Sequence, residues 1–154
     1  MNIIREDTVN GFLFSTDKAR LDLPYIHSFL TQSYWSKGVP MHVISRSIEN
    51  SLAVGIYHHG KQIGFARVIT DHATFGYLAD VFVDQTFRGQ GVSKSLMRFI
   101  FSLEGFESFR RILLATKDAH GLYAQFGFKP LKSPDKFMEI HNPDIYTQPD
   151  RKNI

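Results

Sequence analysis

Hydrophobic and polar positions along the chain predict both strands and helices, and the clearest example lies at residues 81–95. An apolar run ends at Val83, as in a buried strand, and a turn that contains glycine follows it. Apolar residues then recur at helical spacing, at Val92, Leu96, Phe99, Ile100 and Leu103. This stretch predicts a strand, a turn and an amphipathic helix in succession.

The same patterns extend over the rest of the chain. Short apolar or alternating runs, bounded by turn residues, predict strands at residues 11–16, 51–58, 62–70, 75–83, 110–116, 128–131 and 137–140. Helices are predicted from Asp22 to about residue 33, over residues 43–50, after Gly91, and from Asp118 to Phe126. Asp22 and Asp118 stand where N-caps belong, and Gly127 stands where a left-handed C-terminal residue is expected.

The order of these elements indicates the fold class. Three consecutive strands over residues 51–83 are joined by tight turns and are therefore expected to be antiparallel. The strand at 110–116 follows a helix, so it should lie parallel to the strand at 75–83. We expect an α/β fold of the α+β kind, with a mixed, mostly antiparallel sheet of about seven strands flanked by about four helices.

Composition narrows the domain organisation. The 154 residues are 43% hydrophobic and 21% charged, which is ordinary for a soluble globular protein with one core. We expect a single domain over residues 1–140. Residues 141–154 are rich in proline and polar side chains, and they are expected to form a poorly ordered tail.

Charge and cysteine content exclude several classes of function. No apolar run approaches the roughly 20 residues of a membrane span, and the chain has no cysteine for disulfides, thiolate metal sites or a thiol nucleophile. The net charge of +3 is spread along the chain rather than gathered in a basic block, so nucleic acid is not indicated. The small positive charge suits an anionic small molecule as well as it suits nucleic acid. A cytoplasmic protein without a membrane partner is expected.

The turn before the central helix offers a site for an anion. Gly89 and Gly91 allow the backbone to approach a ligand closely, and the first amides of a helix have no intrahelical acceptor. The helix dipole also favours negative charge there, so the turn suits a phosphate. A tight strand-to-helix connection that uses glycine only for steric reasons is the alternative interpretation.

Two motifs resemble those of the GNAT family of N-acetyltransferases. One is R-G-Q-G at residues 88–91 after V-F-V, and the other is D-A-H-G-L-Y-A-Q-F-G-F at residues 118–128. The order of elements is similar as well, over nearly the whole chain. The chain departs from the family's turn consensus at Thr86, where glutamine or arginine is usual.

The resemblance implies acetyl-coenzyme A as co-substrate, with its pyrophosphate held by backbone amides. It implies that the strands at 75–83 and 110–116 splay apart, so that the backbone of Phe82 and Val83 is free for the pantetheine. Asp118 is implied as a further pantetheine contact, although it also suits an N-cap alone. The residues implied as amide donors to the pyrophosphate are Arg88, Gly89, Gln90, Gly91, Val92 and Ser93.

Tyr123 matches the family tyrosine that protonates the departing thiolate. A phenol with an ordinary pKa of about 10 is still protonated at neutral pH, so it can donate. A purely packing role against the sheet is the alternative. No serine-elbow motif is present, so direct transfer without an acyl-enzyme is favoured.

Asp80 is the ionisable residue of the strand before the turn, and strand alternation places it on the same face as Leu78 and Phe82. It is a candidate general base or a binder of a cationic amine, or a structural carboxylate paired with Arg67.

The acceptor is expected to enter beside Asp80, Tyr34, Trp35 and Tyr77, which suits a small primary amine with an apolar body. Trp35 is expected on a loop, either lining this pocket or anchoring the loop to the core. No metal site is expected, because the histidines lack partners at ligand spacing. A protein acetyltransferase and a non-catalytic acyl-coenzyme A binding module remain alternatives, and a homodimer is compatible with the fold.

Overall fold

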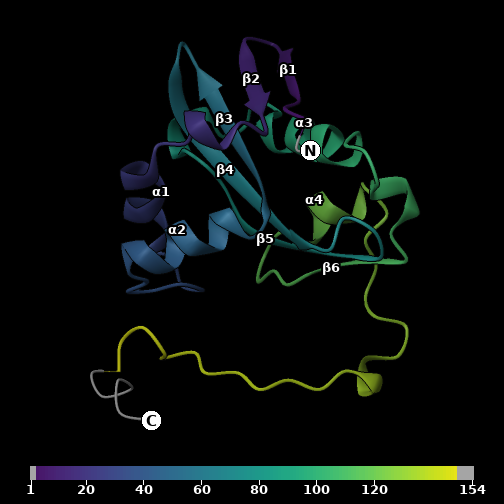
Figure 1. The fold of residues 1–154 in the computed structure, drawn as a ribbon. Coiled ribbons are helices and arrows are strands. Elements are labelled where there is room, and N and C mark those ends of the chain that lie inside the picture. The colour runs from purple at the N-terminus through teal and green to yellow at the C-terminus, as the bar shows by residue number, and fades with distance from the viewer. Residues whose placement is uncertain (1–2, 149–154) are drawn as a thin grey trace.

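The computed structural model describes residues 3–148, which form one six-stranded sheet with helices on both faces (Figure 1). The strands lie side by side in sequence order, and all neighbours are antiparallel except β5 and β6, which are parallel. The predicted mixed, mostly antiparallel sheet is therefore confirmed. The strands are β1 (Glu6–Val9), β2 (Phe12–Ser15), β3 (Leu52–His58), β4 (Lys61–Thr70), β5 (Phe75–Val83) and β6 (Arg111–Leu114).

Four α-helices form within residues 3–148, and each overlaps a predicted one: α1 (Leu23–Leu30), α2 (Met41–Glu49), α3 (Val92–Phe101) and α4 (His120–Ala124). The predicted cap of α1 is confirmed, because the Asp22 carboxylate accepts a hydrogen bond from the Tyr25 amide at 3.0 Å. Pro24 lies in the first turn, where a missing amide hydrogen is harmless.

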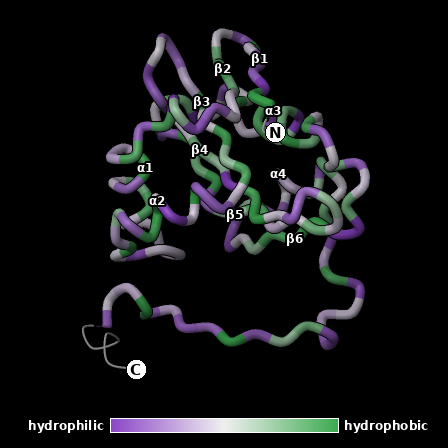
Figure 2. Tube along the Cα trace, viewed as in Figure 1, coloured by the Kyte–Doolittle hydropathy of each residue, from purple (hydrophilic) through white to green (hydrophobic). Residues whose placement is uncertain are grey.

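The sheet separates two apolar cores. On one face, α1 and α2 pack onto Phe65 and Phe82. On the other face, the side chains of α3 and Tyr123 of α4 pack with strand residues such as Val54 and Val68. Figure 2 shows the apolar residues concentrated along the central strands. The α1/α2 face and the α3/α4 face are thus distinct surroundings for any side chain that projects from β5.

A hairpin at the N-terminus differs from the prediction. Strand β1 was not predicted, and it pairs with β2 through a two-residue turn at Asn10 and Gly11. Both turn residues have positive φ, 52° and 83°, as a turn that matches the strand twist requires. The Asn-Gly pair was the available sequence signal, and the polar composition of β1 hid the strand beside it.

A β-bulge in β5 corrects the predicted orientation of Asp80. Two residues, Asp80 and Val81, lie opposite Ala66 of β4, and Asp80 has a φ of 56°. The extra residue reverses the alternation, so Leu78 belongs to the α3/α4 core whereas Phe82 belongs to the α1/α2 core. The expectation that Asp80 shares one face with both is therefore wrong.

The two strands predicted after α4 do not form. Residues 128–131 and 137–140 make no ladder within the described part of the chain, so the sheet has six strands rather than seven. Residues 141–148 cross beneath β6 and α2 in Figure 1, and Tyr146 and Thr147 lie against Gly38. The last six residues of the predicted tail, 149–154, lie outside the described residues.

Candidate active site

The candidate site opens where β5 and β6 separate. The parallel pairing runs from Phe75 with Arg111 to Leu78 with Leu114 and then stops, although β5 continues to Val83. The bulge begins two residues beyond the last pair, and a bulge bends its strand and increases its twist. The expected splay is confirmed, and it leaves the β6-facing backbone of the second half of β5 without a strand partner.

A cavity of about 670 Å³ occupies this splay. Its walls come from β5, the segment after β6, α4, the loop after α1 and the C-terminal segment. The structure gathers six of the predicted site residues there, which lie far apart in the sequence. They are Tyr34, Trp35, Tyr77, Asp80, Asp118 and Tyr123.

Tyr123 is the buried phenol of this cavity. The residue is 8% exposed, and its ring packs edge-on against Phe128. Its hydroxyl makes no hydrogen bond within residues 3–148. It is also not one of the fully buried polar atoms in that range, so it is available to a molecule in the cavity. Burial, with a smaller contribution from nearby Tyr34, raises the pKa of Tyr123 above its usual value. The phenol is consequently a proton donor at neutral pH.

Asp80 holds two other cavity residues together. One carboxylate oxygen lies 2.9 Å from Arg67 Nε, and the other accepts a hydrogen bond from Trp35 Nε1 at 3.0 Å. The side chains of Arg67 and Asp80 are only 14% and 10% exposed, so the ion pair is shielded from solvent. The pairing with Arg67 that the sequence suggested is present. The hydrogen bond to the Trp35 indole was not foreseen.

The loop after α1 reaches across the mouth of the cavity. Tyr34 packs edge-on against Trp35, and the Lys117 ammonium lies 5.6 Å from the centre of the Tyr34 ring. Lys117 follows β6 on the opposite side of the splay. Aromatic side chains from one side thus meet a cation from the other.

The glycine turn has the shape expected of a phosphate cradle. Gly89 and Gly91 have φ angles of 80° and 77°, and apart from their chain neighbours no atom lies within 4 Å of where a side chain would begin. Gly91 caps α3 without a side-chain hydrogen bond, and the first helical amide with an acceptor is that of Ser95, which donates to Gly91 at 3.1 Å. The amides of residues 89–94 donate no hydrogen bond within residues 3–148. Open space and free donors suit a pyrophosphate.

Arg88 joins this turn to the end of β5. Its Nε donates a hydrogen bond to the Val83 carbonyl at 3.2 Å. That carbonyl, which the family resemblance offered to the pantetheine, therefore already has one partner. Phe82 turns its side chain away into the α1/α2 core, where it stacks on Phe29 at 3.8 Å between ring centroids. Phe82 is also paired with Phe65 of β4 and does not line the cavity, so the expectation that its backbone is free for the pantetheine is wrong.

Asp118 is not the N-cap of α4, so that prediction is wrong. Ala119 precedes the helix, and its amide donates to the Thr116 hydroxyl at 3.1 Å. Asp118 is exposed, lines the cavity and takes part in no ion pair within residues 3–148. The left-handed Gly127 at the other end of the helix is confirmed, with a φ of 92°.

The sequence did not indicate Lys117, His141 and Pro143 as cavity residues. Lys117 lies one position before the predicted cap, and the other two belong to the predicted tail. These three residues reach the splay through the tertiary fold of the chain. No local sequence motif predicts that they line the cavity.

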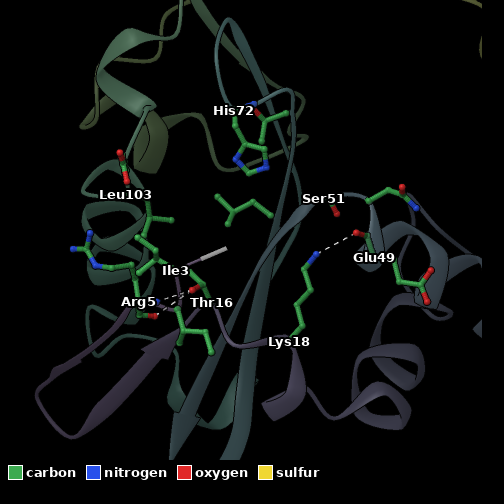
Figure 3. A pocket seen from close by; sticks show the side chains of 13 residues that line it. Ile3, Arg5, Thr16, Lys18, Glu49, Ser51, His72 and Leu103 are labelled. Carbon is green, nitrogen blue, oxygen red and sulfur yellow. Dashed lines mark hydrogen bonds between the residues drawn. The ribbon is translucent and has the colours of Figure 1, made fainter. Parts of the chain in front are cut away.

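Figure 3 shows a second cavity of about 460 Å³, between the N-terminal strands and the end of α3. Arg5, Lys18 and His72 contribute basic groups there, and Lys18 Nζ donates to the Glu49 carbonyl at 3.2 Å. None of its lining residues belongs to the cavity at the splay. It contains none of the predicted catalytic residues.

The described residues show neither a metal-binding cluster nor a membrane-spanning helix. Within residues 3–148, no three His, Cys, Asp or Glu side chains gather closely enough to hold a metal ion. In the same part of the chain, every helix is too short or too polar to cross a membrane.

A sheet that splays beside a glycine turn is the arrangement that the GNAT resemblance implied, and comparison with known proteins agrees. The family described as an acetyltransferase (GNAT) domain matches residues 49–130. This protein belongs to the GNAT acetyltransferase family. The predicted family is therefore confirmed.

Individual relatives support the assignment. A crystal structure from Xanthomonas campestris pv. campestris, assigned to the GNAT family, is 43% identical; the match covers 92% of this chain and 100% of that one, with a TM-score of 0.88. A protein of Gibberella zeae, provisionally named acetyltransferase FG08082, is 27% identical over 83% of this chain and 85% of its own. A GNAT acetyltransferase from Elizabethkingia anophelis, solved with acetyl-CoA bound, shares the fold at 15% identity and a TM-score of 0.62, over 87% of this chain and 90% of its own.

Proposed function

We propose that this protein is an acetyl-coenzyme A dependent N-acetyltransferase that transfers the acetyl group directly to the primary amine of a small molecule. The observation that carries the proposal is the free hydroxyl of buried Tyr123, which faces a 670 Å³ aromatic cavity at the splay of β5 and β6. The acetyl-coenzyme A seen in a family structure with this fold supports the choice of donor.

The residues present suit that donor. The amides of residues 89–94 and the open space at Gly89 and Gly91 would hold its pyrophosphate, and the unpaired backbone of β5 would hold the pantetheine. Bound acetyl-coenzyme A supplies an activated acyl group whose transfer releases a thiolate. Tyr123 would hold a proton at the place where that negative charge develops, and its raised pKa keeps the proton in place until then.

The lining of the cavity supports a small acceptor over a protein. Tyr34 and Trp35 line one side, Lys117 another, and His141 and Pro143 of the C-terminal segment a third. An extended peptide would need an open groove through these walls. Because Arg67 neutralises Asp80, Asp118 is the cavity carboxylate left to attract an ammonium group.

A thiol-release assay tests the proposal directly. The chain has no cysteine, so a thiol reagent reports only released coenzyme A. We expect turnover with some members of a panel of small amines, including amino sugars, polyamines and amino acid derivatives, and at least tenfold lower kcat/KM with lysine peptides. Preference for peptides would identify a protein acetyltransferase. Binding of acetyl-coenzyme A without turnover on any amine would identify a binding module.

We further propose that Asp80 positions Trp35 rather than acting as the general base, because both of its oxygens are engaged. Asp80→Ala removes the acceptor of the indole, so we expect KM for the amine to rise roughly tenfold, as loss of a hydrogen bond to a charged group implies. Asp80→Asn retains one acceptor and should keep most of kcat. Trp35 is the only tryptophan, so its emission should shift in the alanine variant alone.

The pH dependence separates the two roles of Asp80. A positioning role predicts that Asp80→Asn leaves the acidic limb of the kcat/KM profile in place. If the carboxylate is the base, both variants should lose kcat by at least 100-fold and the acidic limb should disappear from the asparagine variant.

A further inference from the structure

The guanidinium of Arg67 is only partly used by its ion pair with Asp80. Its Nε lies 2.9 Å from the carboxylate, whereas Nη1 and Nη2, which carry all its other N–H donors, make no hydrogen bond within residues 3–148. Neither nitrogen is one of the fully buried polar atoms in that range, and Arg67 lines the cavity at the splay. Charged donors without an acceptor, in a site shielded from solvent, favour a ligand that supplies one.

Strand β4 directs Arg67 to the α1/α2 side of the sheet. Its neighbours Ala66 and Val68 belong to the α3/α4 core, so strand alternation turns Arg67 to the opposite face. Ile69 shares that face and is 44% exposed, and Tyr77 of β5 lies opposite it in the ladder. Both line the same cavity. An apolar strip that can receive the body of a ligand therefore adjoins the guanidinium.

Arg67 lies away from the glycine turn. In the ladder it is opposite Ala79, whereas β5 continues to Val83 before the turn begins. Even with one residue taken up by the bulge, this separation is roughly 10 Å along the strand, at ~3.3 Å per residue. The pyrophosphate is expected at the start of α3, so the unpaired donors of Arg67 face the acceptor rather than that phosphate.

The remaining charges of the cavity suit a molecule that carries both signs. Lys117 and Asp118 line it, and neither takes part in an ion pair within residues 3–148. The Lys117 ammonium lies over the Tyr34 ring, which leaves its charge uncompensated by any carboxylate in that range. The cavity thus offers a cation and unpaired guanidinium donors for an anionic group, and one carboxylate for an ammonium group.

We propose that the acceptor amine also carries a carboxylate, so that the substrate is an amino acid, and that Arg67 selects it. The inference rests on the N-acetyltransferase function proposed above. Nη1 and Nη2 of Arg67 would donate to the carboxylate, whose geometry the planar guanidinium matches. The apolar body would lie against Ile69 and Tyr77, and the ammonium would lie toward Asp118.

The chemistry of transfer stays the same for such an acceptor. The amine nitrogen bonds to the acetyl carbon as the bond from that carbon to the thioester sulfur breaks. The ammonium group gives up one proton to the sulfur, by way of Tyr123, and another to solvent. The carboxylate of the acceptor takes no part in these steps, so Arg67 acts on recognition alone.

Matched pairs of amino acids and their decarboxylated amines test the selection. Suitable pairs are phenylalanine with phenethylamine, leucine with isoamylamine, and lysine with cadaverine, which differ only in the carboxylate. In the thiol-release assay we expect kcat/KM to be roughly tenfold or more higher for the amino acid of each reactive pair, as hydrogen bonds to a charged group imply.

Arg67→Lys assigns that preference to the guanidinium. Lysine keeps a positive charge beside Asp80 but lacks the planar pair of donors. We expect the ratio of kcat/KM between amino acid and amine to fall to within about threefold of unity, through a higher KM for the amino acid. Arg20→Lys is the matched control and should keep the wild-type ratio. Arg20 also holds a carboxylate through Nε, 2.8 Å from Glu6, and it does not line the cavity.

Trp35 emission measures recognition without turnover. Trp35 is the only tryptophan, and its indole donates to the same carboxylate that Arg67 holds. N-acetyl derivatives of the amino acids should shift this emission with affinities roughly tenfold above those of the N-acetylated amines. Circular dichroism verifies folding. If Arg67→Lys is unfolded, the double variant Arg67→Met, Asp80→Asn removes both charges of the pair and is judged by the same ratios.

The outcomes separate this inference from the proposed function. Turnover with equal kcat/KM for amino acids and their decarboxylated amines would overturn the inference and leave the N-acetyltransferase in place. A preference that survives in Arg67→Lys would overturn the role of Arg67. Absence of turnover on every amine would overturn the proposed function, and the emission titrations then decide: equal affinities reject the carboxylate site, and a preference lost with Arg67 supports it.

Discussion

Replacing Tyr123 with phenylalanine should lower kcat by about 100- to 1,000-fold, which is the range of a positioned general acid. The ring still fills its place against Phe128, so the fold and the affinity for acetyl-coenzyme A should change little. Only the hydroxyl that faces the cavity is lost. The measurement is steady-state kinetics with the best amine found in the thiol-release assay, beside a titration of the cofactor.

Tyr57→Phe is the matched control for that substitution. Tyr57 is also a buried phenol whose hydroxyl has no hydrogen-bond partner in the described structure, but it lies on β3 away from the cavity at the splay. The control should retain wild-type kcat. A Tyr123→Phe variant as active as this control would remove Tyr123 from the chemistry and leave it a packing role.

The alkaline limb of the wild-type profile provides an independent measure of the same acid. Burial raises the pKa of Tyr123 above the usual value of 10.0. The protonated, active form therefore persists below that pH and is lost only at higher pH. An essential group that deprotonates between pH 8 and 9 would have to be some residue other than Tyr123.

Local sequence patterns predicted most of the fold because the elements carry their own signals. Hydrophobic periodicity located all four helices and the strands β2 to β6, and Asp22 with Pro24 marked the start of α1. The site residues were predicted from the family resemblance and from the assignment of residues 75–83 as a strand. Tyr34, Trp35, Tyr77, Asp80 and Tyr123 do meet in one cavity.

The features that were missed depend on non-local packing. The bulge at Asp80 inserts one residue into a ladder, and hydrophobic periodicity does not register a single insertion. Asp118 looked like an N-cap, yet α4 begins one residue later, with Ala119 in the cap position and no side-chain cap. The strand predicted at 137–140 has suitable residues without a neighbour in its own chain. Each error concerns the partner of a residue rather than its own preference.

Replacing Gly91 with glutamate should weaken acetyl-coenzyme A binding by about 100-fold. The side chain would project into the open space of the turn, where the pyrophosphate is expected. Two like charges about 4 Å apart repel by roughly 4 kcal/mol near a protein surface, and each 1.4 kcal/mol is a tenfold change in affinity. Exposure of the turn reduces that repulsion, which is why the expected loss is below the full Coulomb value. Isothermal titration with coenzyme A measures it.

Gly60→Glu separates charge repulsion from backbone strain. Gly60 has the same φ of 77° as Gly91 and equally open surroundings, but it lies in the hairpin between β3 and β4. Both variants carry the same added charge and force a glutamate into the left-handed region, so they should lose similar thermal stability. Only Gly91→Glu should lose affinity. If the two bind coenzyme A within threefold of each other, the phosphate does not lie at the start of α3, and the donor must be held elsewhere.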